Sequence, residues 1–512
     1  MRVNKLRGIV LFLFMALFLT KPASAEGAFG VAPLNTNKDL LKNYVDGYSI
    51  HIPKNSKVTC DGNYYKTEIT YADTSVKVFI EDSTGKNFSF ADYEYYSLKG
   101  LRDNQSEYEV LYDGVQPTAI GDFHAYQFNR QKLSRVPNDK NHYLIMIKEL
   151  GNNRSVTFMI KSESAINKSE VLSMVGTFKT DVEKKNVEIV PVKQSITTDS
   201  RGNIQAGRTL SAKTAQLYYN DFLTNGNTKW GIFVQDFWRN TTMSDIENKI
   251  DSKFSYALLY HSFSFNNEQI REAIDYCKTW NKSLELTFQT DKVDGKNQIY
   301  SVLNGERDDY FREMAKIIKE EEHPTLFRIG NEMNGDWCSY SAWNTGLDSD
   351  IYTSFYEYIY KIFEEEGANP YILYVFNPNG RNFPNFKYND ESMYRPKEDH
   401  YDILGLTLYN TGTYYSDELW ESFDQLYTKL YNDSLKMYEK PMMITEFACS
   451  TTGGDKVEWT RDMLQKLNTK YPKIKVAIWF NGTDLDASGN PARVYKIDEP
   501  AEVLDVFRAY IK

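Results

Sequence analysis

The pattern of apolar and polar positions changes character near residue 200. Before it, short alternating segments end at turn residues, as antiparallel strands do. These candidate strands cover residues 48–52, 65–71, 76–81, 124–128, 143–148 and 155–160, and amphipathic stretches at 91–101 and 168–178 predict two helices. This part of the chain is therefore predicted to be an α+β domain, followed by a polar linker without periodicity over residues 184–213.

After the linker, continuous apolar runs alternate with amphipathic segments. The runs begin near residues 231, 256, 284, 326, 371, 403, 442 and 475. Residues 309–322 and 351–366 predict helices, and the second ends at Gly367 with Pro370 just beyond. Strands that are apolar throughout are typical of a parallel sheet covered on both faces. Eight such units predict a (β/α)8 TIM barrel over residues 214–512, with an open doubly wound sheet as the alternative.

The first 25 residues have the pattern of a secretory signal peptide. Arg2, Lys5 and Arg7 precede an apolar run at 9–19, which is too short to span a membrane, and Ala23-Ser24-Ala25 has the small side chains of a cleavage site. We therefore expect a secreted protein, cleaved near Ala25, with no membrane span in its mature form. The predicted organisation is a signal peptide at 1–25, an α+β accessory domain at 26–183, a linker at 184–213 and the barrel.

Composition narrows the classes of function. The net charge is −10 and no basic run offsets it, which argues against a nucleic-acid partner. Aromatic residues make up 15% of the chain, more than a core needs and suited to a sugar-binding surface. Four cysteines are too few for a disulfide scaffold, and we expect buried free thiols at Cys60, Cys277, Cys338 and Cys449.

Motifs of several other enzyme classes do not occur in the sequence. It contains no GxSxG, no HExxH and no GxxxxGK[ST], which argues against an α/β-hydrolase, a zincin and a P-loop enzyme. Asp484 and Asp486 imitate the start of a calcium loop, but position twelve is Tyr495 instead of a bidentate glutamate, so we expect an ordinary turn. No cofactor or metal is implied.

Polar residues follow several of the predicted barrel strands. Glu332 follows the fourth strand and Glu446 the seventh. Strand ends and the loops after them form the active face of a barrel, so both carboxylates are expected at one mouth. Glycoside hydrolysis uses such a pair, one acid to protonate the leaving oxygen and one carboxylate to attack the anomeric carbon.

The segment Arg328-Ile-Gly-Asn-Glu-Met-Asn-Gly-Asp-Trp337 resembles the acid/base motif of family 26 glycoside hydrolases, within the large clan of retaining barrel hydrolases. Ile444-Thr-Glu-Phe447 resembles the nucleophile strand of that clan. The resemblance covers roughly residues 215–512. It implies that Glu332 is the general acid/base and Glu446 the nucleophile. Family 26 typically has histidine before the acid/base, whereas Asn331 stands here, as in sister families such as family 5, where it contacts the sugar 2-hydroxyl.

The same resemblance implies roles for further residues. Tyr409 matches the tyrosine that orients the nucleophile, and Trp337 and Trp479 match aromatic residues of the sugar cleft. Gln289 and His261 are weaker candidates for the cleft lining. Each has a structural alternative: an ordinary salt bridge for the glutamates, core packing for Trp479 and Tyr409, and a satisfied internal hydrogen bond for Gln289 and His261.

Together these observations predict a secreted retaining endo-β-1,4-glycanase that acts on a β-glucan or a β-mannan. The alternative is an inactive barrel that only binds a polysaccharide or associates with an exopolysaccharide at the cell surface. The N-terminal domain weakly resembles a PsbP-like domain. We expect it to be non-catalytic and separable, and to contact a polymer or the cell surface.

Overall fold

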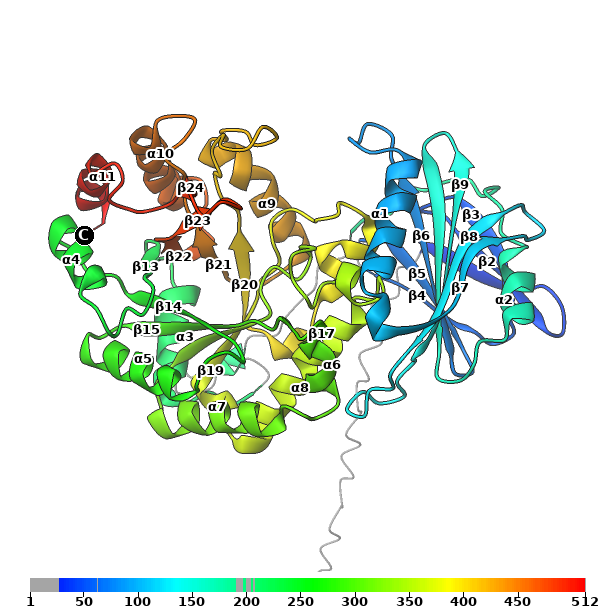
Figure 1. Ribbon diagram of the computed structural model, residues 1–512, viewed down its shortest axis with the longest axis horizontal. Helices are drawn as coiled ribbons and strands as arrows, with labels where there is room; N and C mark the ends of the chain where they lie inside the picture. Colours follow the sequence, from blue (N-terminus) through cyan, green and yellow to red (C-terminus); the bar gives the residue numbers. More distant parts are fainter. Residues whose placement is uncertain (1–26, 62, 190–196, 199–203, 206–207, 512) are drawn as a thin grey trace, which may run out of the picture.

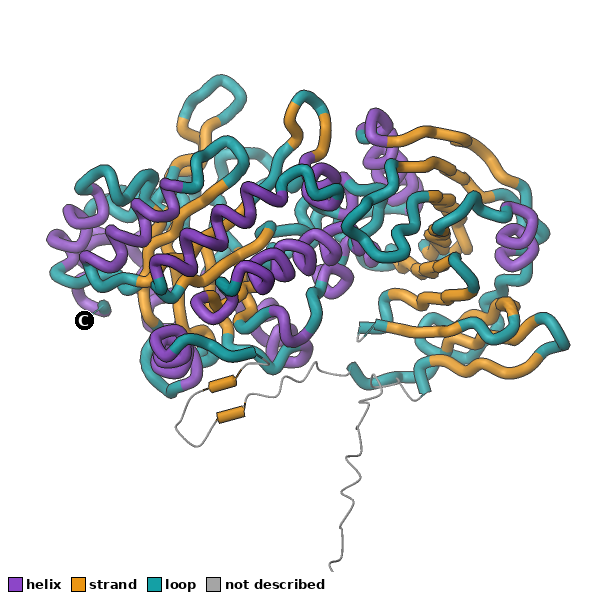
Figure 2. Tube along the Cα trace, turned by 90° about the horizontal axis from the view of Figure 1, so that it is seen from below, coloured by secondary structure: helices purple, strands orange, loops and turns teal. Residues whose placement is uncertain are grey.

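The computed structural model describes residues 27–61, 63–189, 197–198, 204–205 and 208–511. The signal peptide predicted at 1–25 and part of the predicted linker lie outside these residues. The described chain has a β-rich N-terminal lobe and a barrel lobe, which lie side by side in Figures 1 and 2. No helix within the described ranges is long and apolar enough to cross a membrane.

The N-terminal lobe contains two antiparallel sheets. Strands β1 (Phe29–Pro33), β2 (Lys38–Asn43) and β3 (Tyr48–Pro53) form the smaller one. The larger has the order β4-β5-β6-β10-β9-β8-β7. Its strands are β4 (Lys57–Cys60), β5 (Lys66–Tyr71), β6 (Thr74–Asp82), β7 (Tyr108–Gln116), β8 (Phe123–Arg130), β9 (His142–Gly151) and β10 (Arg154–Ser162). The helices are α1 (Phe90–Asp103), which begins with a capping box at Ser89, and α2 (Lys168–Val175).

The two faces of the large sheet pack against different partners. One face, with Val78, Phe158 and Ile160, packs with Tyr48 and Ile50 of β3 and with α2. The opposite face contributes to a core that continues into the barrel. From the sheet this core includes Phe79, Tyr108, Tyr126, Phe128, Tyr143, Ile145, Ile147 and Met159, and from α1 it includes Tyr93, Leu98 and Leu101. The strands alternate between these two cores because successive side chains point to opposite faces.

The C-terminal lobe is a closed parallel barrel, which confirms the predicted fold class. Its strands are β13 (Lys229–Phe233), β14 (Tyr256–His261), β15 (Ser283–Phe288), β18 (Thr325–Ile329), β19 (Ile372–Phe376), β20 (Ile403–Thr407), β21 (Met442–Phe447) and β22 (Ile474–Phe480). The surrounding helices are α3 (Ala212–Tyr218), α4 (Thr242–Ile250), α5 (Glu268–Thr279), α6 (Gln298–Leu303), α7 (Asp308–Glu321), α8 (Asp350–Glu366), α9 (Phe423–Met437), α10 (Lys456–Thr469) and α11 (Glu502–Tyr510).

Short hairpins complete the described elements. They pair β11 (Thr197–Thr198) with β12 (Ile204–Gln205), β16 (Lys292–Val293) with β17 (Lys296–Asn297), and β23 (Thr483–Leu485) with β24 (Pro491–Val494). Asp486 lies in the last hairpin and accepts hydrogen bonds from the backbone amides of Ser488 and Asn490, at 2.8 and 2.9 Å. The calcium-like sequence there forms a turn. All four cysteines are free thiols; three are buried and Cys60 is half-buried.

The connection between β19 and β20 departs from the regular βα repeat. It contains 3-10 turns at Lys387–Asn389, Glu391–Tyr394 and Glu398–His400 in place of an α-helix. The N-terminal lobe packs against this connection: the backbone amide of Lys387 donates to Glu81 at 2.8 Å, and the hydroxyls of Ser97 and Tyr388 lie 3.3 Å apart.

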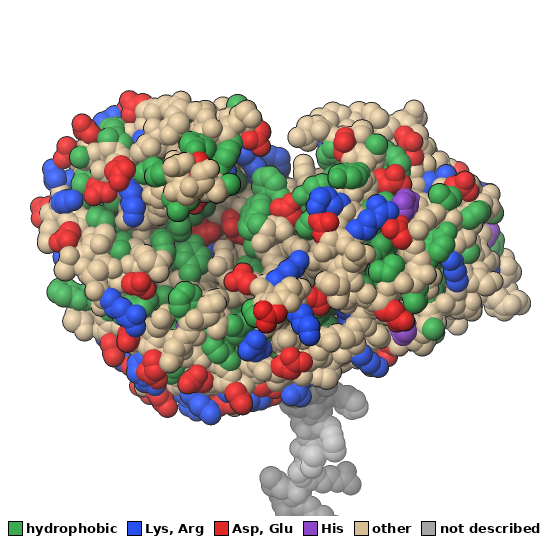
Figure 3. All heavy atoms as spheres, viewed as in Figure 1, with side chains coloured by type: hydrophobic (Ala, Val, Ile, Leu, Met, Phe, Trp, Pro, Cys, Tyr) green, Lys and Arg blue, Asp and Glu red, His purple; other side chains and the backbone are tan. Residues whose placement is uncertain are grey.

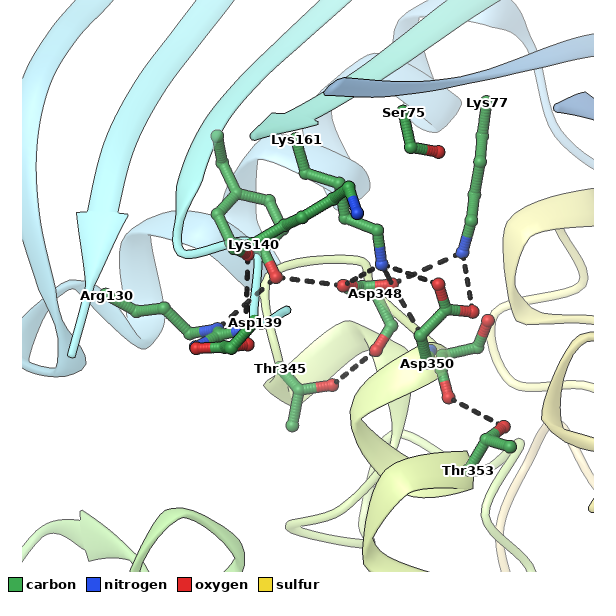
Figure 4. A network of polar contacts seen from close by, with 12 residues as sticks. Ser75, Lys77, Arg130, Asp139, Lys140, Lys161, Thr345, Asp348, Asp350 and Thr353 are labelled. Atoms are coloured by element: carbon green, nitrogen blue, oxygen red, sulfur yellow. Dashed lines mark hydrogen bonds and ion pairs between the residues drawn. The ribbon is translucent and has the colours of Figure 1, made fainter. Parts of the chain in front are cut away.

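The interface between the lobes argues against the expectation that the N-terminal domain is separable. Lys77 on β6 and Lys161 on β10 are buried opposite Asp348 and Asp350 of the barrel lobe (Figure 4). Lys161 Nζ lies 2.8 Å from Asp348 Oδ2, and Lys77 Nζ lies 2.7 Å from Asp350 Oδ1. Removing either lobe would leave charges without partners and expose the shared core, which is strongly destabilising. The polar linker made a boundary visible, but it carried no information about this interface.

Candidate active site

A cleft of about 1460 Å³ opens at the carboxyl ends of the barrel strands. Residues at or just after the carboxyl ends of all eight strands line it, among them Gln235, Tyr260, Gln289, Glu332, Asn379, Leu408, Glu446 and Phe480. Figure 3 shows this hollow in the barrel lobe, with acidic side chains inside it and apolar side chains along its walls. The two carboxylates singled out in the sequence therefore share one cleft.

Glu446 is held at the floor of the cleft by a fully buried arginine. Arg328 Nη2 donates to Glu446 Oε2 at 3.1 Å, and Arg328 Nε lies 2.8 Å from Glu285 Oε1. The same guanidinium donates to Thr287 at 2.7 Å and to Asn377 at 2.8 Å. Arg328 thus joins strands β15, β18 and β21 and fixes the Glu446 carboxylate through a charge-assisted hydrogen bond.

Two buried carboxylates share the single positive charge of Arg328. Burial raises the pKa of Glu446 to about 8. Burial also raises the pKa of Glu285 to about 7, with the Arg328 charge acting against it. Burial penalises the charged form of a carboxyl group, so both glutamates are favoured in their protonated forms.

Glu332 has a more open environment, at the end of β18. Its Oε1 accepts from Asn379 Nδ2 at 2.5 Å, and its Oε2 accepts from Trp337 Nε1 at 3.4 Å. The side chain is half-buried. Burial raises the pKa of Glu332, while the Asn379 hydrogen bond and the Arg328 charge act in the opposite direction. A raised pKa keeps a carboxyl group protonated and able to act as a general acid.

The backbone at Glu332 is left-handed, with φ of 53°. This conformation is unfavourable for a residue with a side chain and persists only where the surroundings hold it. Here the amide of Glu332 donates to the carbonyl of Asn377 and the amide of Gly335 donates to the carbonyl of Glu332, both at 2.8 Å. Asn334 adds paired hydrogen bonds to Asn379 across the two loops. The carboxyl is therefore aimed by a network that joins β18 to β19.

The amides predicted for the cleft lie beside the nucleophile candidate. Asn331 Nδ2 lies 3.5 Å from Glu446 Oε1, and Gln289 Nε2 donates to Asn331 Oδ1 at 2.8 Å. Both residues line the cleft. Tyr409 also lines it, with its ring 5.1 Å from Tyr495. Among the described residues, the side-chain hydrogen-bond partners of Glu446 are Arg328 and Asn331, so the contact predicted for the Tyr409 hydroxyl is not formed.

Trp337 lies at the edge of the cleft, as predicted, and 53% of its surface is exposed. Its ring lies 5.2 Å from that of Phe383, which is also exposed and lines the cleft. An exposed aromatic pair next to Glu332 offers a flat apolar surface to a sugar ring.

Trp479 does not line the cleft, and its predicted role as a sugar platform is wrong. The side chain is fully buried, packs between Phe447, Trp459 and Phe507, and donates from Nε1 to the Tyr495 carbonyl at 2.8 Å. The next residue, Phe480, faces the cleft instead and stacks on Phe233 at 4.8 Å. Successive strand residues point to opposite faces, so Trp479 faces the helices and Phe480 faces the barrel mouth.

His261 likewise belongs to the interior and not to the cleft. It is 1% exposed, and its Nε2 lies 3.0 Å from Asn267 Oδ1 and 2.8 Å from the Tyr310 hydroxyl. Burial lowers the pKa of this imidazole. The contacts of His261 Nε2 with Asn267 and Tyr310 give this residue a structural role. The prediction that His261 lines the substrate cleft is therefore wrong.

Sequence reasoning missed several cleft residues. The most informative is Asn379, which holds Glu332 and comes two residues after Asn377 in the segment that follows β19. Polar residues at that strand end were the signal, because strand ends face the active mouth. Arg328 was visible within the motif, but its contacts with Glu285 and Glu446 depend on barrel closure. Phe383 and Phe480 carried no distinguishing signal.

Comparisons with known proteins agree with the barrel assignment. Residues 239–448, which include both Glu332 and Glu446, match the model of Glycosyl hydrolase family 26. A curated relative, Endoglucanase H of Acetivibrio thermocellus, is 30% identical over 216 residues, which is 41% of this chain. This chain spans about a fifth of the length of that relative, 22%. The resemblance to family 26 seen in the sequence is therefore confirmed for this part of the barrel.

Solved structures with a similar fold include two mannanases. The catalytic domain of a family 26 endo-β-1,4-mannanase from Bacillus sp. JAMB-750 has a TM-score of 0.46 at 16% identity, and the match covers 62% of this chain and 94% of that one. A modular endo-β-1,4-mannanase from Cellulomonas fimi has a TM-score of 0.45 at 16% identity, covering 59% of this chain and 74% of that one.

The different burial of Trp479 and Trp337 predicts that truncation to alanine destabilises the protein only at Trp479. Trp479→Ala should reduce the free energy of unfolding by about 3–5 kcal/mol, because it leaves a cavity among Phe447, Trp459 and Phe507. Trp337→Ala should leave stability almost unchanged, because the ring is largely exposed. Thermal melting of both variants checks this. Equal melting temperatures for wild type and Trp479→Ala would contradict the buried position.

The raised pKa of Glu446 predicts a pH-dependent effect on stability. Its folded pKa of about 8 exceeds the ordinary value of about 4.3, so the native state holds an extra proton between these pH values. Glu446 therefore adds to the free energy of unfolding at low pH. This contribution is lost as the pH rises through 8.

Glutamine does not ionise, so Glu446→Gln should not lose stability in this way. The melting temperature of the variant minus that of wild type should therefore be larger at pH 8 than at pH 5. Glu439→Gln, at an exposed position, is the control and should behave alike at both pH values. A difference between Glu446→Gln and wild type that does not change with pH would show that Glu446 is already ionised at pH 5.

Proposed function

We propose that this protein is a secreted, retaining glycoside hydrolase that cleaves internal bonds of a neutral β-linked polysaccharide. The observation that carries the proposal is the meeting of two carboxyl groups with different environments in one cleft. Glu446 is buried against Arg328, and Glu332 is half-buried with Asn379 and Trp337. The family 26 match over residues 239–448 and the relative named as an endoglucanase support it.

In the proposed mechanism, Glu446 reacts in its ionised form, which Arg328 stabilises by a hydrogen bond and which becomes more populated as the pH rises toward its pKa of about 8. This carboxylate attacks the anomeric carbon while the Glu332 carboxyl donates its proton to the leaving oxygen. The glycosidic bond breaks and a glycosyl ester forms on Glu446. Glu332, now ionised, takes a proton from water, whose oxygen attacks the same carbon and releases Glu446. Arg328 keeps the nucleophile oriented, and Asn331 is placed beside Glu446 where a sugar 2-hydroxyl would lie. The same pair argues against a barrel that only binds polysaccharide, since binding needs neither carboxyl.

The charges of the cleft support a neutral substrate. Its cationic side chains are already engaged: Arg381 with Glu421 at 2.6 Å, Arg493 with Glu418 at 2.6 Å, and Lys496 with the Asn481 carbonyl at 3.3 Å. Acidic residues of the lining also include Asp417 and Asp484. Among the described residues of the lining, a uronate or sulfate group would therefore meet mostly like charge, with both arginines already paired to carboxylates.

Several parts of the proposal rest on sequence. Secretion rests on residues 1–25, with cleavage near Ala25. Endo action suits an open cleft that residues from all eight strand ends line. Asn331 in the place of the usual histidine leaves both β-glucan and β-mannan as substrates.

The direct test of the mechanism is Glu332→Gln. We expect activity on the natural polymer to fall by about 10²–10⁴-fold, the usual worth of general acid–base catalysis. The first step on aryl glycosides with very good leaving groups should be spared, and azide should rescue the second step. Melting should be unchanged, and Glu439→Gln should keep full activity. Wild-type rates of Glu332→Gln on the polymer would overturn the acid/base assignment.

A substrate screen tests the substrate class. Soluble β-glucan, β-mannan and xylan are compared with a polyuronate, and the products are sized and their anomeric configuration followed by NMR. We expect cleavage of a neutral polymer, with retained configuration and oligosaccharide products from early times. Faster cleavage of the polyuronate would contradict the charge argument, and an inverted first product would contradict the double displacement.

A further inference from the structure

The loop that carries Glu332 also contacts the N-terminal lobe. This acid/base loop, residues 330–349, connects β18 to α8 and includes Glu332 and Trp337 at the cleft, and Asp336 and Asp348 at the interface with the N-terminal lobe. Its outer half is therefore bound by a domain that contributes no side chain to the cleft lining.

Helix α1 contacts the loop close to Trp337. The Tyr96 hydroxyl donates a hydrogen bond to Asp336 Oδ2, and the Tyr96 carbonyl accepts one from Trp343 Nε1 at 3.1 Å. The Tyr96 and Trp343 rings lie 5.4 Å apart. Asp336 is the immediate neighbour of Trp337, which in turn donates to Glu332. A short chain of contacts thus runs from α1 to the acid/base carboxyl.

The same helix is shaped to receive Trp343. A Cβ atom at Gly100 would lie 2.7 Å from Trp343 Nε1, so only glycine lets the indole approach this closely. The Lys99 ammonium lies over the Trp343 ring at 5.3 Å. Further along the loop, Gly346 has a φ of 75°, and a Cβ atom added there would lie 3.0 Å from the ring of Phe128.

The far end of the loop is anchored by the buried ion cluster of Figure 4. Asp348 is 1% exposed and accepts from Lys161 at 2.8 Å and from the Tyr143 hydroxyl at 2.9 Å. Burial alone would raise the pKa of Asp348, but the Lys161 and Lys77 ammonium groups outweigh it and the pKa is lowered. The three partners come from adjacent strands of one sheet, β6, β10 and β9, which makes them a rigid support.

We propose that the N-terminal lobe positions the acid/base loop, and that Tyr96 is a positioning residue for Glu332 acting through Asp336 and Trp337. Glu332 has a left-handed backbone that its surroundings must hold. General acid catalysis depends on placing the proton within hydrogen-bond reach of the leaving oxygen. If the loop were released from α1, Glu332 would still be present, but its carboxyl group would no longer be held in position for proton transfer.

Tyr96→Phe tests the proposal, because it removes one hydroxyl and keeps the ring packed on Trp343. Tyr95→Phe is the matched control, since the neighbouring Tyr95 is 65% exposed on the same helix. In the full-length protein we expect Tyr96→Phe to lower kcat on the natural polymer about ten-fold, within the range that small misplacements cause. An aryl glycoside with a very good leaving group should lose less, and melting should match that of Tyr95→Phe.

The kinetic readout rests on the proposed function, so a second measurement is independent of activity. Hydrogen exchange of the backbone amides in residues 333–349 should be faster in Tyr96→Phe than in wild type and unchanged in Tyr95→Phe. A wild-type protein without activity on any glycan, but with this change in exchange, would reject the enzyme assignment and keep the positioning. Unchanged exchange and unchanged kcat would overturn the positioning.

Gly100→Ala gives a second, independent variant. Alanine is the better helix former, so helix propensity predicts no loss of stability. The added methyl group must displace Trp343 and with it the loop. We expect the same kinetic pattern as for Tyr96→Phe, with a larger loss on the polymer than on the activated aryl glycoside. A Gly100→Ala enzyme with equal losses on both substrates and a lower melting temperature would assign the contact to stability alone.

Discussion

The single buried positive charge of Arg328 organises the cleft of this protein. It lies inside the barrel with no solvent to screen it, and it must be balanced by Glu285 and Glu446 at the same time. Because a guanidinium presents its donors in a fixed fork, satisfying it determines where four neighbouring side chains lie. The raised pKa of Glu446 follows from its burial. Removing Arg328 would leave two buried carboxyl groups without their cation. The arrangement of the cleft floor and of the barrel interior therefore depends on this one side chain.

The acid/base side depends on a different constraint, which is the closure of a long loop. Residues 330–349 leave the barrel, contact the N-terminal lobe and return to α8, so two domains share the task of fixing one segment. The hydrophobic core is also shared, since Phe128 and Tyr143 of the large sheet belong to the same cluster as the barrel residues. The N-terminal lobe is therefore better described as part of one folded body than as an appended module.

Differences between the predicted and observed site have particular physical causes. Glu332 and Glu446 were found because charged residues directly after apolar strands are unusual and their positions at the barrel mouth follow from topology. Trp479 was misplaced because β22 (Ile474–Phe480) is apolar from Val476 onward, and such a run has no polar alternation to show which side chains face the cleft. His261 was misplaced because an imidazole after a strand has the same sequence signature whether it binds a ligand or an internal asparagine.

By itself, the sequence determined the number and order of the barrel strands, the location of the two carboxyl groups at one mouth and the absence of a disulfide framework. These properties follow from local patterns, namely apolar runs of strand length, helix ends and residue counts. Only the tertiary structure decided that Phe480 replaces Trp479 in the cleft, that Asn379 and Arg328 hold the two carboxyl groups, and that Lys77 and Lys161 are buried against Asp348. Each of these contacts joins residues distant in the chain, and their pairing depends on strand register and on how two lobes close over one loop, which no local pattern encodes.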